Sequence, residues 1–320
     1  MNQSTNPSNS AKKGTTTQST SFEEDIQSKM AGKESIPIPQ LAPEAFHGPI
    51  GRISQAIGPH TEADISAVHI QLLVAFGNAI GHGPFFKTDG TEHSTNEFCC
   101  IVGKSSKSRK GTSWGYARTI MREIDRQWAH HSVKSGLSSG EGLIYHVRDA
   151  VKEMQRDKKT GVIEEVELDH GVADKRLLSV ETEFARVFDV MNRQGNTLST
   201  TVRDAWDTGN LNSLVKNSPV AGHGAHISII GHITLDELKR RMKEAEYFNG
   251  FGNRFPWVIA QRSKLLPYGG SFEMSDIEDE IKALRDAFAW AKDVEENGTG
   301  RTGECSLGGY LQIPECRRER

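Results

Sequence analysis

The sequence lacks the features of several protein classes. It has no run of about 18 apolar residues, so no transmembrane helix is expected. It begins with the polar stretch MNQSTNPSNSAKKGTTTQSTS, which has no apolar core of the kind a signal peptide needs. Only four cysteines occur, none in a CxxC pair, which argues against a disulfide framework or a cysteine-rich metal site. These absences predict a cytoplasmic protein with no membrane partner.

A strong excess of charge is also missing. The formal net charge of −3 gives no global attraction to nucleic acid, so any such contact must come from local basic clusters. Aromatic residues are sparse around these clusters, which argues against a broad base-stacking surface. Such clusters usually lie on solvent-exposed faces. Arg156–Lys159 and Lys239–Lys243 are the best candidates for contacts with a phosphate backbone. The clusters are Lys104–Lys110, Arg156–Lys159, Lys239–Lys243 and Arg317–Arg320.

Composition divides the chain into three parts. Residues 1–45 comprise a polar tail, expected to be disordered because it cannot bury enough apolar surface, and a proline-rich arm from Ile36 to Pro49 that leads into the domain. Residues 46–270 carry the periodic apolar patterns of an ordered domain. Residues 271–320 contain one more helix, capped by Ser275, and then a Gly-rich segment with a basic end.

Strand-like runs alternate with helical patterns along the central part. A helix over Thr61–Ile80, capped by Thr61, is followed by the runs Phe85–Lys87 and Glu97–Val102. Later helices are expected over Leu143–Met154 and Glu183–Arg193 and after Thr234, with a charged insertion, interpreted as a hairpin, over Arg156–Gly171. Buried strands are expected over Lys175–Val180, His226–Ile233 and Arg254–Ala260. This alternation predicts an α/β fold with a mainly parallel sheet and helices on both faces.

The clearest chemical signal is GKSSKSRKGTS, from Gly103 to Ser113. An apolar strand ends in a glycine, a loop of small and basic residues follows, and a hydroxyl pair then opens a helix. Backbone N–H groups at such a helix start favour phosphate oxygens, a lysine can reach the β- and γ-phosphates, and a Ser or Thr hydroxyl can bind magnesium. We therefore assign the binding of ATP and Mg²⁺ to Gly103, Ser108, Lys110, Gly111, Thr112 and Ser113.

This loop departs from the usual pattern GxxxxGK[ST]. Six residues separate Gly103 from Lys110, Arg109 replaces the glycine before the lysine, and Gly111 precedes Thr112. Lys110 is the candidate for the phosphates and Thr112 for magnesium. The alternative is a basic loop that binds anions or a nucleic-acid backbone without positioning a nucleotide.

Five blocks in this order extend the argument beyond the loop: VGKSSKSRKGTSWG, SGLSSGEGLIYHVRD, ETEFARVFDVMNRQGNTLSTTVRDAWDTGNL, GAHISIIGHITLDEL and GFGNRFPWV. Together they resemble a poorly characterised family of RecA-like P-loop ATPase domains encoded by bacteria, phages and plasmids, often beside primase-polymerase or helicase modules. The resemblance covers roughly residues 49–270 and implies ATP binding and replication-linked work. Family members continue past SKLLPYGG into further helical sequence, so we expect a shortened C-terminus here.

Three acidic residues are candidates for metal and water. Glu181 and Glu183 follow an apolar run, where a carboxylate can hold magnesium through water or orient the attacking water. If the strand continued through both residues, their side chains would lie on the same face of the sheet. Otherwise their negative charge suits the N-terminus of a helix, where the helix dipole favours it. Glu141 resembles the catalytic base that some RecA-like ATPases carry after the second strand, although Ser138-x-x-Glu141 also fits a capping box.

Two further residues have competing interpretations. His232, late in an apolar strand, could sense the γ-phosphate or could be a core histidine with its hydrogen bonds satisfied. Arg254 resembles an arginine that family members keep before a strand. It could act as an arginine finger, which stabilises transition-state charge in the site of a neighbouring subunit, or it could form a structural ion pair. His223, His226 and His232 make no convincing zinc site, because cysteine and carboxylate partners are missing nearby.

The expectation is therefore an ATP-hydrolysing domain in DNA replication or mobile-element maintenance, similar to a helicase or a helicase loader. Single-stranded DNA, a primase or helicase partner, and other copies of the chain are the expected partners. The alternatives are a nucleotide- or nucleic-acid-binding module without turnover, which the displaced glycines favour, and a scaffold within a replication complex.

Overall fold

The computed structural model describes residues 39–88, 91–104, 106–156, 161–213 and 220–297. The chain divides into two units, residues 1–39 and 40–320. Most of the expected tail, and the expected Gly-rich basic end, lie outside the described residues. The expected central domain and the helix after it fall in the same unit.

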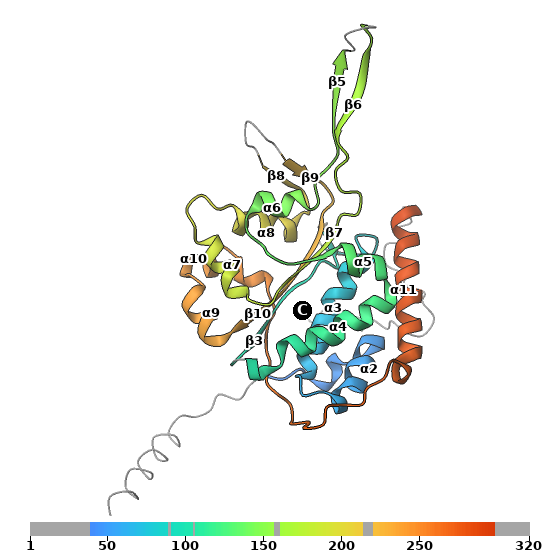
Figure 1. The fold of residues 1–320 in the computed structure, drawn as a ribbon, viewed down its shortest axis with the longest axis vertical. Helices are drawn as coiled ribbons and strands as arrows, with labels where there is room; N and C mark the ends of the chain where they lie inside the picture. Colours follow the sequence, from blue (N-terminus) through green and yellow to red (C-terminus); the bar gives the residue numbers. More distant parts are fainter. Residues whose placement is uncertain (1–38, 89–90, 105, 157–160, 214–219, 298–320) are drawn as a thin grey trace, which may run out of the picture. The chain divides into compact units, whose positions relative to one another are not determined.

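Five parallel strands form the central sheet, in the order β11-β3-β10-β7-β4 (Figure 1). Their bounds are β3 Phe98–Gly103, β4 Val133–Lys134, β7 Arg176–Glu181, β10 His226–Thr234 and β11 Trp257–Ile259. The runs of β3, β7 and β10 are almost continuously apolar because helices cover both faces of the sheet. The register pairs Thr234 with Gly103 and Gly231 with Glu181, so β3, β10 and β7 end along one edge. This confirms the α/β class and the parallel sheet.

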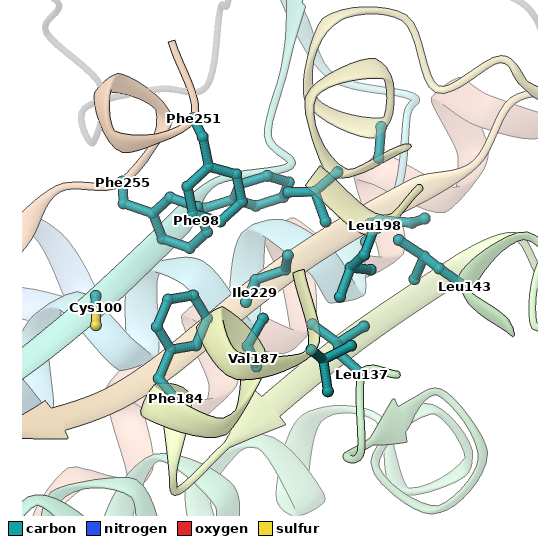
Figure 2. Close-up of a cluster of buried hydrophobic side chains, with 14 of the residues drawn as sticks. Phe98, Cys100, Leu137, Leu143, Phe184, Val187, Leu198, Ile229, Phe251 and Phe255 are labelled. Carbon is teal, nitrogen blue, oxygen red and sulfur yellow. The ribbon is translucent and has the colours of Figure 1, made fainter. Parts of the chain in front are cut away.

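Helices cover both faces of the sheet. On one face lie α3 (Ile65–Ile80), α4 (Lys110–Ile124) and α5 (Arg126–His131), against Cys99, Ile101 and Ile230. Behind them, α2 (Gly48–Ile57) and α11 (Glu278–Asn297) pack on α3 and α4. The other face is covered by α6 (Gly140–Tyr145), α7 (Phe184–Met191), α8 (Leu198–Asp207) and α9 (Leu235–Arg241), followed by α10 (Glu244–Phe248). Figure 2 shows the apolar cluster on this second face, where Phe98, Phe251 and Phe255 gather.

The connections change face between β3 and β10. The chain leaves β3 through α4 on one face and leaves β10 through α9 and α10 on the other. Because β3 and β10 are neighbours, their carboxyl ends form a switch point, the place where open α/β sheets bind ligands.

Three antiparallel hairpins lie outside the sheet: β1 (Phe85–Thr88) with β2 (Thr91–Ser94), β5 (Val151–Arg156) with β6 (Ile163–Asp169), and β8 (Leu211–Ser213) with β9 (Val220–Gly222). The insertion is thus a hairpin, as expected, but it begins at Val151. Of the helix expected over Leu143–Met154 only Leu143–Tyr145 is helical, within α6, and the rest of that prediction is wrong. The Asp149 N–H donates to the Ala221 carbonyl and the Asp149 carboxylate pairs with Lys175. These contacts hold Asp149 in a non-helical segment, so the expected helix does not continue through it.

The first helix of the domain starts later than expected. The cap of α3 is Asp64, whose carboxylate accepts the Ser66 N–H, and Thr61 instead accepts the Ala63 N–H. Asp and Thr are both good caps, so sequence preference could not separate them. The expected extended arm is partly helical, because Pro49 sits in the first turn of α2, where a missing N–H costs nothing.

The other end of the domain also differs in detail. Ser275 lies inside a 3₁₀ turn rather than at a helix cap. The 3₁₀ turns are Pro43–Ala45, Gly58–His60, Ser106–Ser108, Gly252–Arg254 and Met274–Ile277. Among the described helices, none combines the length and the apolar character that crossing a membrane requires.

Candidate functional site

The loop between β3 and α4 folds back on the end of its own strand. A Cβ on Gly103 would lie 2.2 Å from the Ser108 hydroxyl oxygen and 2.5 Å from the Ser108 Cβ. Ser108 is buried against this glycine at 5% exposure. The glycine is therefore needed for the close approach, and Ser108 shapes the loop from inside.

Arg109 stands where the usual pattern has glycine, and it adopts the backbone conformation of glycine. Its φ of 56° is the one positive value among the described non-glycine residues, a conformation that L-residues other than glycine adopt at a cost. Its Nε donates to Glu62 at 2.7 Å, while the other carboxylate oxygen of Glu62 accepts the Leu266 N–H. The contacts of Glu62 with Arg109 and Leu266 thus stabilise this loop conformation, which would not be expected from a sequence without the usual glycine.

Free backbone donors follow directly. The first hydrogen bond of α4 runs from the Ser113 N–H to the Arg109 carbonyl, so the N–H groups of Gly111 and Thr112 have no acceptor within the helix. A Cβ on Gly111 would meet nothing within 4 Å, which leaves the backbone open to a close ligand. This helix start can receive an anion.

Lys110 is the first residue of α4, directly after the loop that leaves β3. Its charge influences Glu237, in the first turn of α9, and His232 of β10. Burial lowers the pKa of Lys110, and the Glu237 carboxylate opposes that shift. A half-buried ammonium beside the free N–H groups of α4 is the strongest positive feature of this edge.

The two hydroxyl candidates have different environments. Ser113 is fully buried; its hydroxyl donates to the Lys110 carbonyl at 2.6 Å and accepts from the Gln71 amide at 2.7 Å. Thr112 is exposed and lines a hollow of about 450 Å³ with Tyr116 and Phe272. The structure therefore favours Thr112 over Ser113 as a metal-binding hydroxyl.

His232 belongs to the same buried network. Its Nε2 lies 2.8 Å from the Gln71 side-chain oxygen. Burial lowers the pKa of His232 to about 4, helped by the nearby Lys110, so the ring is neutral and Nε2 donates. The geometry is that of a core histidine with its hydrogen bond satisfied, and the chain His232–Gln71–Ser113 links the end of β10 to the Lys110 carbonyl.

Glu181 ends β7 on the same edge as the loop. One carboxylate oxygen accepts the N–H groups of Gly136 and Leu137, at 2.7 and 3.0 Å, and the Ser179 hydroxyl at 2.8 Å. Within the described residues all its hydrogen bonds fall on this Oε1. Glu181 thus fixes the loop after β4 and keeps its second oxygen for another partner.

Glu183 and Glu141 are placed differently. The strand ends at Glu181, so Glu183 does not share its side; it occupies the N-cap of α7, exposed and without a capping hydrogen bond. Ser139, not Ser138, caps α6, so the expected capping box is absent. The Glu141 carboxylate instead accepts the Thr197 hydroxyl at 3.1 Å.

Arg254 lies just before β11 and therefore at the opposite edge of the parallel sheet. Its guanidinium forms an ion pair with Asp207 and donates to the Gly250 carbonyl. Within one chain it does not join the residues at the loop, and a finger role in another copy would require it to leave Asp207.

Two residues of this edge were missed by sequence reasoning. Gln71 is one of three polar residues buried on α3, with His69 and Asn78, and polar residues within such an apolar helix are a detectable signal of a buried network. Glu237 completes a capping box with Thr234, and the hydrogen bonds from Thr234 lower the pKa of its carboxyl group. In the described part of the chain, no cluster of three or more His, Cys, Asp or Glu residues is suited to a metal ion.

No protein-family model matches this chain, and a search of curated proteins finds no match to it either.

Proposed function

We propose that the chain is a RecA-like ATPase domain that binds magnesium-ATP between the carboxyl ends of β3, β10 and β7. The observation that carries the proposal is the loop at the switch point, where the free N–H groups of α4 and the half-buried Lys110 lie together. Glu181 ends a strand two positions away, a separation of about 10 Å. That span suits an acidic residue that acts beyond the terminal phosphate.

Each residue has a role that its surroundings support. The N–H groups of Gly111 and Thr112 and the Lys110 ammonium would hold the phosphates. The hollow beside Thr112, with Tyr116 and Phe272 in its wall, would accept the nucleoside. Thr112 is suited to bind magnesium directly, and the second carboxylate oxygen of Glu181, farther away, would reach the metal through water. The metal would neutralise charge on the phosphates, and Glu181, Glu183 or Glu141 would orient the attacking water.

The resemblance of the five sequence blocks supports a use in DNA replication or mobile-element maintenance. Such a role would couple nucleotide turnover to a strand of DNA or to a primase or helicase partner, and neighbouring copies could complete the site.

A second candidate is a nucleotide-binding module that does not turn over. Ser113 is held in the interior, and glycine takes the place of the usual hydroxyl after Lys110. A site of this kind could bind ATP without aligning it for attack. A basic loop within a scaffold protein is the remaining alternative and predicts no nucleotide affinity.

The test is magnesium-dependent ATP binding and hydrolysis by the wild type and by Lys110→Ala, with and without single-stranded DNA. A lost charge-assisted contact should weaken binding by about 10- to 100-fold and abolish turnover. Lys282→Ala, at an exposed position on α11, is the matched control and should behave as wild type. Binding without wild-type turnover would favour the non-hydrolysing module, and no binding by the wild type would sink the proposal.

A further inference from the structure

Two large aromatic side chains stand exposed on α10. Phe248 is 82% exposed and Tyr247 is 54% exposed, whereas the nearby Phe251 and Phe255 are buried at 1% and 3%. Burying a phenylalanine stabilises a protein, so the chain forgoes that gain at Phe248. Adjacent exposed aromatics of this kind mark a surface that contacts something else.

Cationic side chains precede this pair along the chain. Lys239, Arg240 and Arg241 form the last turn of α9, and Lys243 occupies the N-cap position of α10. The Arg241 side chain pairs with Asp189, whereas the side chains of Lys239 and Lys243 form no hydrogen bond or ion pair with any residue that the structure describes.

The carboxylates of these helices are partly used elsewhere. Glu237 accepts hydrogen bonds from Thr234, and Glu246 accepts them from Ser199 and Asn249. Asp236 and Glu244 remain exposed beside the lysines. The segment from Leu235 to Phe248 thus carries four Lys or Arg residues and four Asp or Glu residues, so a ligand here would be held by stacking first and by individual lysines second.

From this arrangement we infer that the α9–α10 surface binds single-stranded nucleic acid, with bases stacked on Phe248 and Tyr247 and phosphates near Lys239 and Lys243. Unpaired bases expose the faces that aromatic side chains stack on, whereas a duplex keeps those faces inside. The sparse aromatics noted from sequence argued against such a surface. Their exposure on a five-residue helix beside unpaired lysines reverses that expectation.

The surface is joined to the nucleotide site. Helix α9 follows β10 directly (Figure 1). Thr234, at the end of β10, pairs with Gly103 in the sheet, and Glu237 in the first turn of α9 interacts with Lys110. A single-stranded nucleic acid bound to the α9–α10 surface would therefore lie one short helix away from the loop between β3 and α4. The use of this surface in a strand-dependent ATPase rests on the proposed function, but the binding itself does not.

The experiment is fluorescence anisotropy of a labelled oligothymidylate of about 16 nucleotides, without nucleotide, at several salt concentrations. Phe248→Ala should weaken binding by about 5- to 100-fold, and Tyr247→Ala should act in the same direction. Lys243→Ala should reduce the salt slope by about 0.7, the value for one phosphate on a single strand. Duplex DNA of the same sequence should bind more weakly than the single strand.

Phe86→Ala, which removes another exposed phenylalanine, on β1, is the matched control and should bind as wild type. The inference is overturned if the wild type does not bind the strand at low salt, or if Phe248→Ala binds it unchanged. It is also overturned if Phe248→Ala alters only the oligomeric state, measured by sedimentation, since the aromatics would then form a protein contact. ATP binding by the same variants separates this outcome from failure of the proposed function: Phe248→Ala should bind ATP as wild type.

Discussion

At the scale of single residues, Arg109 combines an unfavourable backbone conformation with an ion pair to Glu62, a residue far away in the sequence. A left-handed conformation costs a non-glycine residue about 1–2 kcal/mol, and an ion pair as exposed as Arg109–Glu62 contributes only about 0–1 kcal/mol. The ion pair offsets only part of the cost. Arg109 can therefore stand in a position that usually requires glycine, and the loop keeps its shape.

This balance predicts different results for two substitutions. Arg109→Gly removes the strain together with the ion pair, so its free energy of unfolding should stay within about 1 kcal/mol of wild type. Arg109→Ala loses the ion pair but keeps the strain, so it should be less stable than the glycine variant by about 1 kcal/mol. Urea unfolding measures both. Equal losses in the two variants would show that the Glu62 contact, not the backbone, controls this position.

Residue types in the loop were predictable, but their partners were not. Lys110 could be assigned from the strand, loop and helix start that surround it. The orientation of Ser113 depends on Gln71, which belongs to a different helix. The interaction of Lys110 with Glu237 depends on the pairing of β10 with β3. Such contacts follow from tertiary packing, and a pattern within a short window contains no information about them.

At the scale of elements, the strands of the sheet were predictable where they are long. The runs of β3, β7 and β10 are buried on both faces and therefore almost continuously apolar. β4 has only two residues, Val133 and Lys134, and left no pattern to detect. The 3.6-residue pattern at Leu143–Met154 was misleading because its second half pairs with β6 in a hairpin.

The β5–β6 hairpin is separable from the core. Of the residues in these two strands all but Asp169 are exposed, and Arg148 forms an ion pair with the Asp169 carboxylate at the base of the hairpin. Carboxylates outnumber cations on the two strands, and Arg156 donates to the Gly161 carbonyl. Phosphate contacts at the insertion, expected from its basic end, are therefore disfavoured on the described strands; residues 157–159 lie outside the described residues.

Replacing residues 152–167 with a short Gly-Ser linker should leave the free energy of unfolding within about 1 kcal/mol of wild type. The reason is that the Arg148–Asp169 and Asp149–Lys175 ion pairs at the base remain in place. Urea unfolding and circular dichroism measure the effect. A loss of cooperative unfolding would show instead that the hairpin completes the core.

At the scale of the whole molecule, two buried histidines connect the sheet to α3. His226 donates from Nε2 to the Gly77 carbonyl at the start of β10, and His232 donates to Gln71 near its end. Burial lowers the pKa of His226 to about 3 and that of His232 to about 4. Both rings are neutral in the folded protein under conditions in which the unfolded chain takes up protons.

The sign of the pH dependence follows from this difference. An unfolded histidine titrates near pH 6.5, so between pH 6.5 and about 4 the unfolded chain binds more protons than the folded protein does. Stability is therefore fully present above pH 6.5 and falls as the pH is lowered. Each histidine contributes a slope of up to about 1.4 kcal/mol per pH unit. Urea unfolding at intervals between pH 7.5 and 5 should show this decline.

His232→Asn should make the decline shallower even if it lowers stability at every pH, because the readout is the slope and not the absolute free energy. His69 and His146, whose pKa values burial also lowers, keep their own contributions. His131→Asn, at an exposed position, is the matched control and should leave the slope unchanged. A free energy of unfolding that stays constant from pH 7.5 to 5 would mean that these histidines reach solvent and carry protons in the folded state. In that case the buried link from His232 through Gln71 and Ser113 to the loop between β3 and α4 would not persist in solution.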